Sequence, residues 1–213
     1  PTQGNLIYTY QWQDSSKSAT WTTRGTLISP YSPAALTDTT WYRRIVNSSK
    51  CTNTSSKVVI NVHKPIANNI AKLISGPGPD TTICSGAIPN MIIGTVPTGG
   101  TDIPASYAYQ WSSSPDNVTF TDIATSGTLQ NYQPGALAAT TYFRRRAISG
   151  MCSSFSNSIR VIVLPPITNN IIAISKPAVC FNTVPPTVTG TSLTGGAGGT
   201  PTWIWQESTD GVN

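Results

Sequence analysis

The stretch that decides the fold is Tyr31-Ser-Pro-Ala-Ala-Leu36-Thr-Asp-Thr-Thr40-Trp-Tyr42-Arg-Arg44, which recurs as Tyr132-Gln-Pro-Gly-Ala-Leu137-Ala-Ala-Thr-Thr141-Tyr-Phe143-Arg-Arg145. Each cassette carries a Leu, a Thr four residues later and an aromatic residue two further on. In this pattern the Leu closes one end of a core, and the aromatic residue begins an inward-facing series with period two. The cassette therefore predicts a chain that crosses between two packed β-sheets.

The repeat extends well beyond the cassette. Tyr8-Thr-Tyr-Gln-Trp12 recurs as Tyr107-Ala-Tyr-Gln-Trp111 and, in a degenerate form, as Trp203-Ile-Trp205-Gln. A period near 100 residues is the usual size of one β-sandwich domain and is too long for a solenoid repeat. We therefore predict three domains in series: a partial copy over 1–64 that lacks its first strands, a complete copy over 65–165, and a partial copy over 166–213 that lacks its last strands. Because neither end is a natural domain boundary, we expect a piece of a longer protein.

The spacing inside the cassette resembles the crossing between strands E and F of immunoglobulin-like and fibronectin type III sandwiches. The predicted fold class is therefore all-β, with tandem immunoglobulin-like or fibronectin-III-like sandwiches. Alternation of aromatic and polar residues predicts that each copy holds a central Trp in its core, and that the aromatic residue after the crossing also faces inward. These core positions are Trp12, Trp111, Trp205, Tyr42 and Phe143. The alternative for the aromatic residues is a sugar-binding platform.

Arginine runs follow both crossings, and they place Arg on both faces of the same strand. The spacing from the Leu predicts that Arg44 and Arg145 point inward, with their stems stacked on the aromatic rings of the neighbouring strand. We expect Trp111 to stack on Arg145. The functional alternative is that these arginines form an anion-binding row.

The four cysteines recur with the repeat, but they contain no Cys-x-x-Cys pair. If Cys84 opens the second copy at the end where the last two strands turn, it meets Cys152, and the two form a disulfide. The long closed loop would then stabilise the domain by up to about 4 kcal/mol. Cys51 and Cys180 would have partners outside this sequence. The alternative is that the cysteines are buried free thiols.

The segments between copies are short and contain Pro, as in Lys64-Pro65 and Pro165-Pro166. Such linkers are stiff, so consecutive copies are expected to form a rod. Gly-rich stretches at 94–100 and 190–199 lie between two predicted strands and read as long loops. No helix follows them, so they do not fit a phosphate-binding loop.

Composition argues against catalysis and against nucleic acid. Only 10% of the residues are charged, against about 25% in an average soluble domain. With one His and eight scattered acidic residues, no catalytic or metal-binding constellation can be assembled. We therefore expect no enzyme activity, no catalytic residue, no metal and no cofactor. The net charge is +5, but five of the thirteen basic residues lie in the two Arg runs, so we expect no nucleic-acid partner.

Five motifs together resemble the tandem immunoglobulin-like repeats of bacterial gliding-motility surface adhesins of the SprB type. They are Ile83-Cys-Ser-Gly-Ala, Tyr109-Gln-Trp-Ser-Ser, Tyr132-Gln-Pro-Gly-Ala-Leu, Thr140-Thr-Tyr-Phe-Arg-Arg and Met151-Cys-Ser-Ser. The resemblance spans the second copy and the matching parts of the others, and it departs at Trp203-Ile-Trp205. It implies export by the type IX secretion route and display at the cell surface as a filament.

We therefore expect the stalk or adhesive length of a large secreted bacterial surface adhesin, active in gliding motility and surface attachment. The expected location is extracellular, at the cell surface, with attachment to the outer membrane through other parts of the protein. The expected partners are neighbouring repeats of the same chain and a surface polysaccharide or another extracellular ligand. The alternative is an accessory or carbohydrate-binding sandwich array of a secreted polysaccharide-degrading enzyme.

Overall fold

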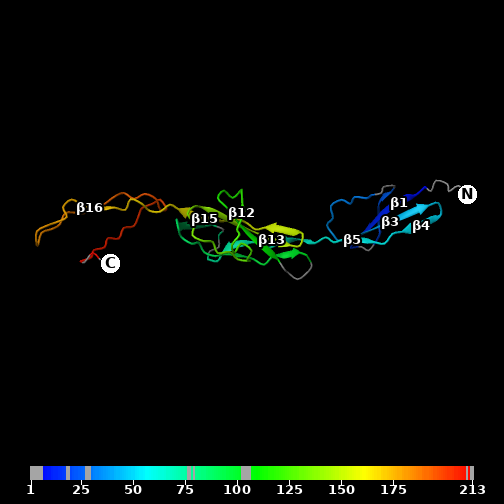
Figure 1. Cartoon of the computed structure of the whole chain (residues 1–213), viewed down its shortest axis with the longest axis horizontal. Coiled ribbons are helices and arrows are strands. Elements are labelled where there is room, and N and C mark those ends of the chain that lie inside the picture. The colour runs from blue at the N-terminus through cyan, green and yellow to red at the C-terminus, as the bar shows by residue number, and fades with distance from the viewer. Residues whose placement is uncertain are drawn as a thin grey trace. The chain divides into compact units, whose positions relative to one another are not determined.

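The structure, a computed structural model, describes residues 7–17, 20–26, 30–75, 78, 80–101, 107–209 and 211. Within these ranges every regular element is a β-strand, so the predicted all-β class is confirmed. The same ranges contain no helix of the length and apolar character needed to cross a bilayer. The strands of each copy can be followed in Figure 1.

The first copy forms one antiparallel sheet in the order β2-β1-β3-β4, with β5 also paired to β3. The central strand β3 follows the first cassette, and its residue Arg44 lies opposite Trp12 of β1. Trp21 directly precedes β2. The strands are β1 (Thr9–Ser15), β2 (Thr22–Thr26), β3 (Thr40–Ser48), β4 (Cys51–Thr54) and β5 (Val58–Ile60).

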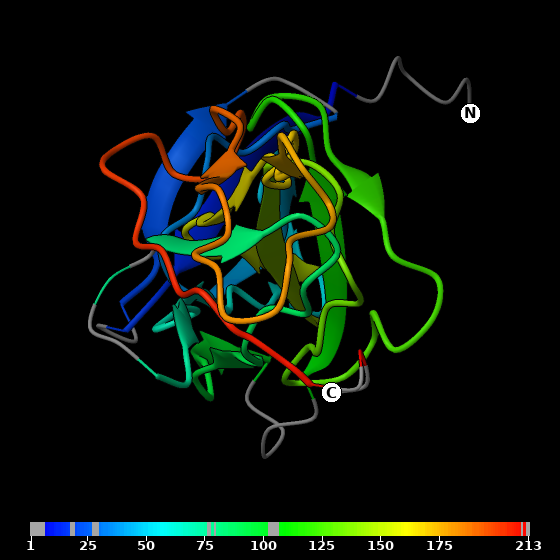
Figure 2. The same cartoon turned by 90° about the vertical axis from the view of Figure 1, so that its left-hand side faces the viewer.

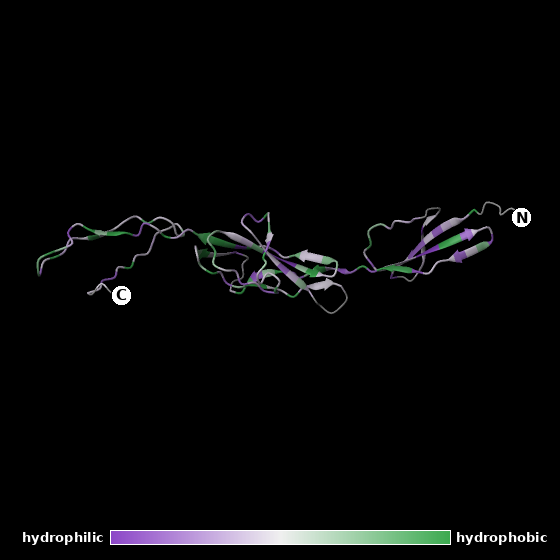
Figure 3. Ribbon diagram, viewed as in Figure 1, coloured by the Kyte–Doolittle hydropathy of each residue, from purple (hydrophilic) through white to green (hydrophobic). Residues whose placement is uncertain are grey.

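The second copy repeats this sheet and adds a strand at its edge. The order is β12-β11-β13-β15-β8, with β14 also paired to β13. The added strand, β8, runs parallel to β15, whereas β15 is antiparallel to β13. The strands are β8 (Asp80–Cys84), β11 (Ala108–Ser114), β12 (Thr121–Asp122), β13 (Thr141–Ser149), β14 (Cys152–Phe155) and β15 (Ile159–Leu164). The last strand of each copy, β5 or β15, is coloured hydrophobic in Figure 3.

A second layer closes the core of the second copy. It consists of β7 (Ala71–Leu73) paired with β9 (Ile92–Gly94), and Ile92 also bridges Tyr132 of the cassette. Two antiparallel layers joined by crossings, with an edge strand parallel to the last strand, make an immunoglobulin-like sandwich. The core cluster draws on both layers: Ala71, Leu73, Ile92, Trp111, Phe143, Ile159 and Val161.

The linker before the second copy is itself a strand. Residues Lys64–Ala67 form β6, which pairs with β10 (Thr98–Gly100) in the predicted Gly-rich loop. Gly99 makes this approach possible: its φ is +81°, and a Cβ there would lie 2.2 Å from the Pro65 carbonyl oxygen. The expectation of a long loop over 94–100 is therefore wrong. Its ends belong to β9 and β10. Glycine has no side chain, so the backbone of β10 can approach that of β6.

The third copy starts in the same way. Thr168 bridges Thr194, and a Cβ at Gly195 would lie 1.9 Å from the carbonyl oxygen of Pro166. The copy continues with the ribbon of β16 (Ile172–Ile174) and β17 (Val188–Gly190), and its other described residues form loops (Figure 2). The expected loop over 190–199 begins at Gly190, the last residue of β17, and includes Thr194 of this bridge.

Contacts divide the chain differently from its sequence copies. One compact unit contains Pro1–Asn68, Pro97–Ala108 and Ala147–Ser154, and the other contains Asn69–Val96, Tyr109–Arg146 and Phe155–Asn213. The pairing of β6 with β10 explains why residues near 98–100 group with the linker. The boundaries expected at 64/65 and 165/166 describe the sequence copies and stay a prediction.

Candidate functional site

The core of the second copy contains an aromatic triad built by the cassette. Tyr132 lies between Trp111, at 5.9 Å between ring centroids, and Phe143, at 5.7 Å. Trp111 is fully buried, Phe143 is 2% exposed, and the indole Nε1 of Trp111 donates to the Leu129 carbonyl. These contacts use a ring face and the polar edge of Trp111 inside the protein. The ring is therefore a core group in this structure and does not form a sugar-binding platform.

The first copy holds the same triad in a less covered form. Tyr31 lies 5.8 Å from Trp12 and 6.2 Å from Tyr42, with nearly the same interplanar angles as in the second copy. Tyr42 is buried, which raises the pKa of its hydroxyl, but Trp12 is only half-buried. The described residues of this copy include no counterpart of the β7–β9 layer, which explains the exposure. Sequence reasoning missed Tyr31 and Tyr132 as core residues, although the repetition of a Tyr at the start of each cassette was the signal.

Arg145 lies at the centre of the second copy, with no exposed surface. Its guanidinium donates to Asn69 Oδ1 from Nε (3.0 Å) and from one terminal nitrogen (2.7 Å). It also donates to the backbone carbonyls of Thr95 (2.7 Å) and Gln130 (2.9 Å). The guanidinium carbon lies 4.5 Å from the Tyr109 ring centroid and 5.9 Å from that of Trp111. The inward position matches the expectation, although the closer ring is Tyr109.

None of the partners of Arg145 is a carboxylate, so a buried cation is held by neutral oxygens and ring faces. Burial lowers the pKa of the Arg145 guanidinium from its ordinary value. Arginine nevertheless stays protonated in proteins. Its charge is therefore compensated by four charge-assisted hydrogen bonds and by the aromatic faces. These partners bind Arg145 into the core and leave its guanidinium with no access to an external anion.

In the first copy Arg44 takes the same place on the central strand β3. Its guanidinium lies 5.1 Å from the Tyr10 ring centroid and 5.7 Å from that of Trp12, and the side chain is half-buried. The inward arginine is therefore a feature of both copies that contain the cassette.

The opposite face of β13 carries the other arginines. Burial alternates along β13, so Arg144 and Arg146 lie on the face away from Phe143 and Arg145. Arg160 of β15 pairs with Tyr142, the neighbour of Arg144 on this outer face. All three arginine side chains are half-buried. We call Arg144, Arg146 and Arg160 the outer arginine row.

Aromatic rings cover the guanidinium of Arg144. It lies 3.8 Å from the Phe120 ring centroid and 4.2 Å from that of Phe155. In the first copy Arg43 occupies the matching position, 4.1 Å from the ring centroid of Trp21, and donates to Gln13. In both copies this outward arginine therefore connects the central strand β3 or β13 to an aromatic residue just before β2 or β12.

The predicted disulfide between Cys84 and Cys152 is absent, and all four cysteines are free thiols. Cys84 ends β8 and pairs with Leu164, beyond the start of β13, whereas Cys152 follows the other end of β13 at Ser149. A nine-residue strand spans about 30 Å, and a disulfide requires Cα atoms within about 7 Å. Because β8 runs parallel to β15, Cys84 lies at the opposite end of the sandwich from the end that the sequence predicts.

A domain family described as a domain of unknown function, DUF8696, matches residues 1–64 and 76–165. These segments make up most of the chain and correspond to the first copy and nearly all of the second. The chain belongs to the DUF8696 family. A search of curated proteins finds no match. Among solved structures, a crystal structure of murine CEACAM1b is similar, with 12% identity, a TM-score of 0.38, and coverage of 76% of this chain and 89% of that chain.

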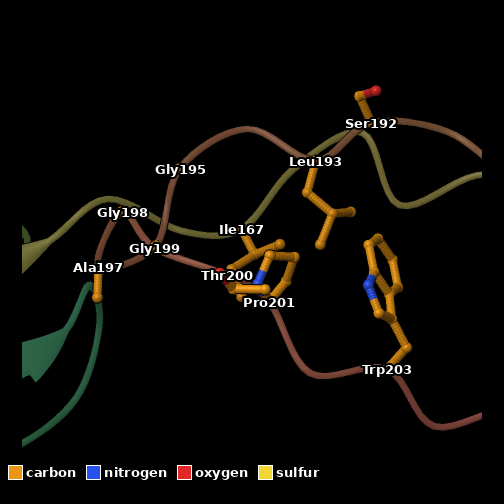
Figure 4. Close-up of a pocket in the computed structure, with 11 residues that line it drawn as sticks. Ile167, Ser192, Leu193, Gly195, Ala197, Gly198, Gly199, Thr200, Pro201 and Trp203 are labelled. Carbon is orange, nitrogen blue, oxygen red and sulfur yellow. The ribbon is translucent and has the colours of Figure 1, made fainter.

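The third copy of this DUF8696 chain lies outside the family match and contains a hollow. Ile167, Leu193 and Trp203 point into it, and the Gly-rich segment 195–199 forms its rim (Figure 4). In the second copy the residue matching Ile167 is Ile66, which is buried at 8% exposure. The hollow therefore lies at a position that is covered in the second copy, next to β6.

The expectation that Trp205 lies in a core is wrong for this structure, because its side chain is 59% exposed. Its counterpart Trp111 is covered by residues of β13 and β15, and the described part of the third copy contains no such strands. Within the described ranges of this DUF8696 chain, no group of three or more His, Cys, Asp or Glu side chains could hold a metal ion.

Proposed function

We propose that this chain is part of the repeat region of a large secreted bacterial surface adhesin, acting as a stalk or adhesive filament in surface attachment and gliding motility. The observation that carries this proposal is the backbone pairing of each linker with the Gly-rich segment of the copy that follows it. β6 pairs with β10, and Thr168 bridges Thr194 in the same way. A chain that only needed to connect domains would not require this repeated pairing.

The pairing leaves little free chain between sandwiches. Only Asn61, Val62 and His63 separate β5 from β6, and only residues 165–167 separate β15 from the Thr168 bridge. Hydrogen bonds and Pro residues restrict the rest of each linker. We propose that successive copies form a stiff rod, as a stalk that transmits tension requires.

The second copy suggests how such a stalk would resist tension without a disulfide. Its layers are joined by the Trp111, Tyr132 and Phe143 triad and by the hydrogen bonds of Arg145 to Asn69, Thr95 and Gln130. Separating the layers would expose a large apolar core and leave a charged group without its partners. The function proposed is therefore mechanical and requires no catalytic group.

The proposed location is extracellular, at the cell surface, after export by the type IX route, with attachment to the outer membrane through other parts of the protein. The proposed partners are neighbouring repeats of the same chain and a surface polysaccharide or another extracellular ligand. The low content of charged residues, 10%, supports an extracellular β-protein of this kind.

Immunoelectron microscopy of intact source cells tests the proposal. Antibodies raised against residues 65–165 are expected to label filaments that project from the cell surface. Shearing the cells is expected to remove this label and to abolish their attachment to surfaces. Label that stays inside the cell, or that is released in a complex with a polysaccharide hydrolase, would contradict the adhesin proposal.

A further inference from the structure

The outer arginine row lacks the side-chain acceptors that Arg24, Arg43 and Arg145 have. Arg145 is held by Asn69 and two carbonyls, Arg24 donates to both oxygens of Asp14, and Arg43 donates to Gln13. By contrast, the Nε atoms of Arg144, Arg146 and Arg160 are buried and have no hydrogen-bond partner. Within the described part of the chain, no ion pair involves any of these three side chains. Among the described residues, no oxygen therefore accepts a hydrogen bond from the Nε atoms of this row.

The row belongs to the second copy alone. The position of Arg146 on β13 corresponds to Ile45 on β3, and that of Arg160 on β15 corresponds to Val59 on β5. The sandwich scaffold therefore accepts apolar residues at both positions, and the arginines are not needed to form the sheet.

Like charges on this face are close enough to repel one another. Residues two apart on one strand, such as Arg144 and Arg146, are separated by about 7 Å, and cross-strand diagonal neighbours are about as close. Two acidic residues are near on the same sheet. Asp80 lies opposite Arg160 but is exposed and makes no ion pair, and Asp122 accepts a hydrogen bond from Ser112. A row of unpaired cations on a sheet face favours an extended ligand that carries anionic groups.

We propose that the outer arginine row binds an acidic polysaccharide, with its carboxylate or sulfate groups accepting hydrogen bonds from the terminal nitrogens of Arg146 and Arg160. The stacking of Arg144 between Phe120 and Phe155 fixes one guanidinium and covers a face of each ring. Those faces are then not free to stack on bases, which favours a polysaccharide over a nucleic acid. The inference deepens the proposed adhesive role, on which it rests, by naming the class of ligand.

Binding of the whole chain to immobilised dextran sulfate tests the inference, with neutral dextran as the reference surface. Replacing both Arg146→Gln and Arg160→Gln is expected to weaken binding about tenfold or more, the loss of one or more charge-assisted contacts. The matched control is Lys50→Gln with Lys57→Gln, which removes the same charge from exposed positions of the first copy and is expected to leave binding unchanged. Arg146→Ile with Arg160→Val, which installs the residues of the first copy, keeps the test informative if the first variant folds poorly.

An equal loss in the row variants and in the lysine control would overturn the inference, because binding would then follow net charge alone. Absence of wild-type binding, or displacement by duplex DNA at lower concentration than by dextran sulfate, would overturn it as well. These results would not contradict the proposed stalk function, since surface filaments and chain dimensions are measured without a ligand. Conversely, a chain that binds through the row but is not displayed at the surface would contradict the proposed function alone.

Discussion

Arg145 and Asn69 are bound to each other through both ends of the asparagine side chain. Two guanidinium nitrogens of Arg145 donate to Asn69 Oδ1, and Asn69 Nδ2 lies 3.3 Å from the Arg145 carbonyl oxygen, to which it donates. Asn69 stands between the linker strand β6 and the first core strand β7, whereas Arg145 lies on the central strand β13. The pair therefore connects the start of the second copy to its opposite layer.

Replacing Asn69 by Ala is expected to lower the free energy of unfolding of the second copy by about 2–4 kcal/mol, because a buried cation loses its side-chain acceptor. Urea denaturation of the whole chain measures this change. Asn170, the matching residue of the third copy, is exposed and serves as the control, with an expected change within about 0.5 kcal/mol for Asn170→Ala. Equal stability of the Asn69 variant and the wild type would show that Arg145 finds other acceptors.

Replacing Trp111 by Ala is expected to destabilise the second copy by about 3–5 kcal/mol, the cost of deleting a large core aromatic side chain. Thermal unfolding followed by circular dichroism measures the shift. The control is Trp205→Ala, since Trp205 is 59% exposed and its removal leaves no cavity. A Trp111 variant that kept its Tm but lost binding to a glycan would instead make the ring a ligand platform.

Replacing Gly99 by Ala is expected to break the pairing of β6 with β10, because the new Cβ would lie 2.2 Å from the Pro65 carbonyl oxygen at a φ of +81°. The local cost is about 1–3 kcal/mol. Hydrogen exchange of the β6 and β10 amides should become faster. Gly135→Ala is the control, since a Cβ there meets nothing within 4 Å. Unchanged exchange in the Gly99 variant would mean that the linker pairing does not depend on this glycine.

The turn after β11 is expected to loosen in acid. Hydrogen bonds from Ser114 and from the Val118 and Thr119 amides lower the pKa of Asp116 from 3.8 to about 2. A depressed folded-state pKa stabilises the fold above the unfolded value, and this contribution disappears as the pH falls from about 4 to about 2. NMR titration of the carboxyl group measures the pKa. A midpoint near 3.8, or the same amide exchange profile in Asp116→Asn, would contradict the expectation.

Local patterns predicted the strands well, because each pattern records which face of a strand is buried. Alternation around Trp111 predicted β11, and the distance from Leu137 placed Phe143 and Arg145 on the inner face. These predictions depend on neighbours within a few residues. The partner of Arg145 could not be predicted in this way, since Asn69 lies 76 positions away, in a segment interpreted as a linker.

The failures at Cys84 and at the Gly-rich stretch over 94–100 share one physical origin, which is pairing between segments distant in sequence. Cys84 was assigned to the wrong end, because nothing in its local sequence shows that β8 runs parallel to β15. The Gly-rich stretch ending at Gly100 resembled a loop, because the backbone approach of Pro65 that requires Gly99 comes from outside that stretch. The outer arginine row likewise became visible only when β15 placed Arg160 beside β13.

The extended stalk is the central claim, and small-angle X-ray scattering of the chain in dilute solution tests it most directly. Three copies of about 40 Å each, arranged end to end, give a rod with a radius of gyration of about 35 Å. A single compact particle of this length would have a radius of gyration of about 17 Å. The stalk predicts a skewed distance distribution with a long tail and a value near the larger figure. A symmetric distribution with a value near the smaller figure would contradict it.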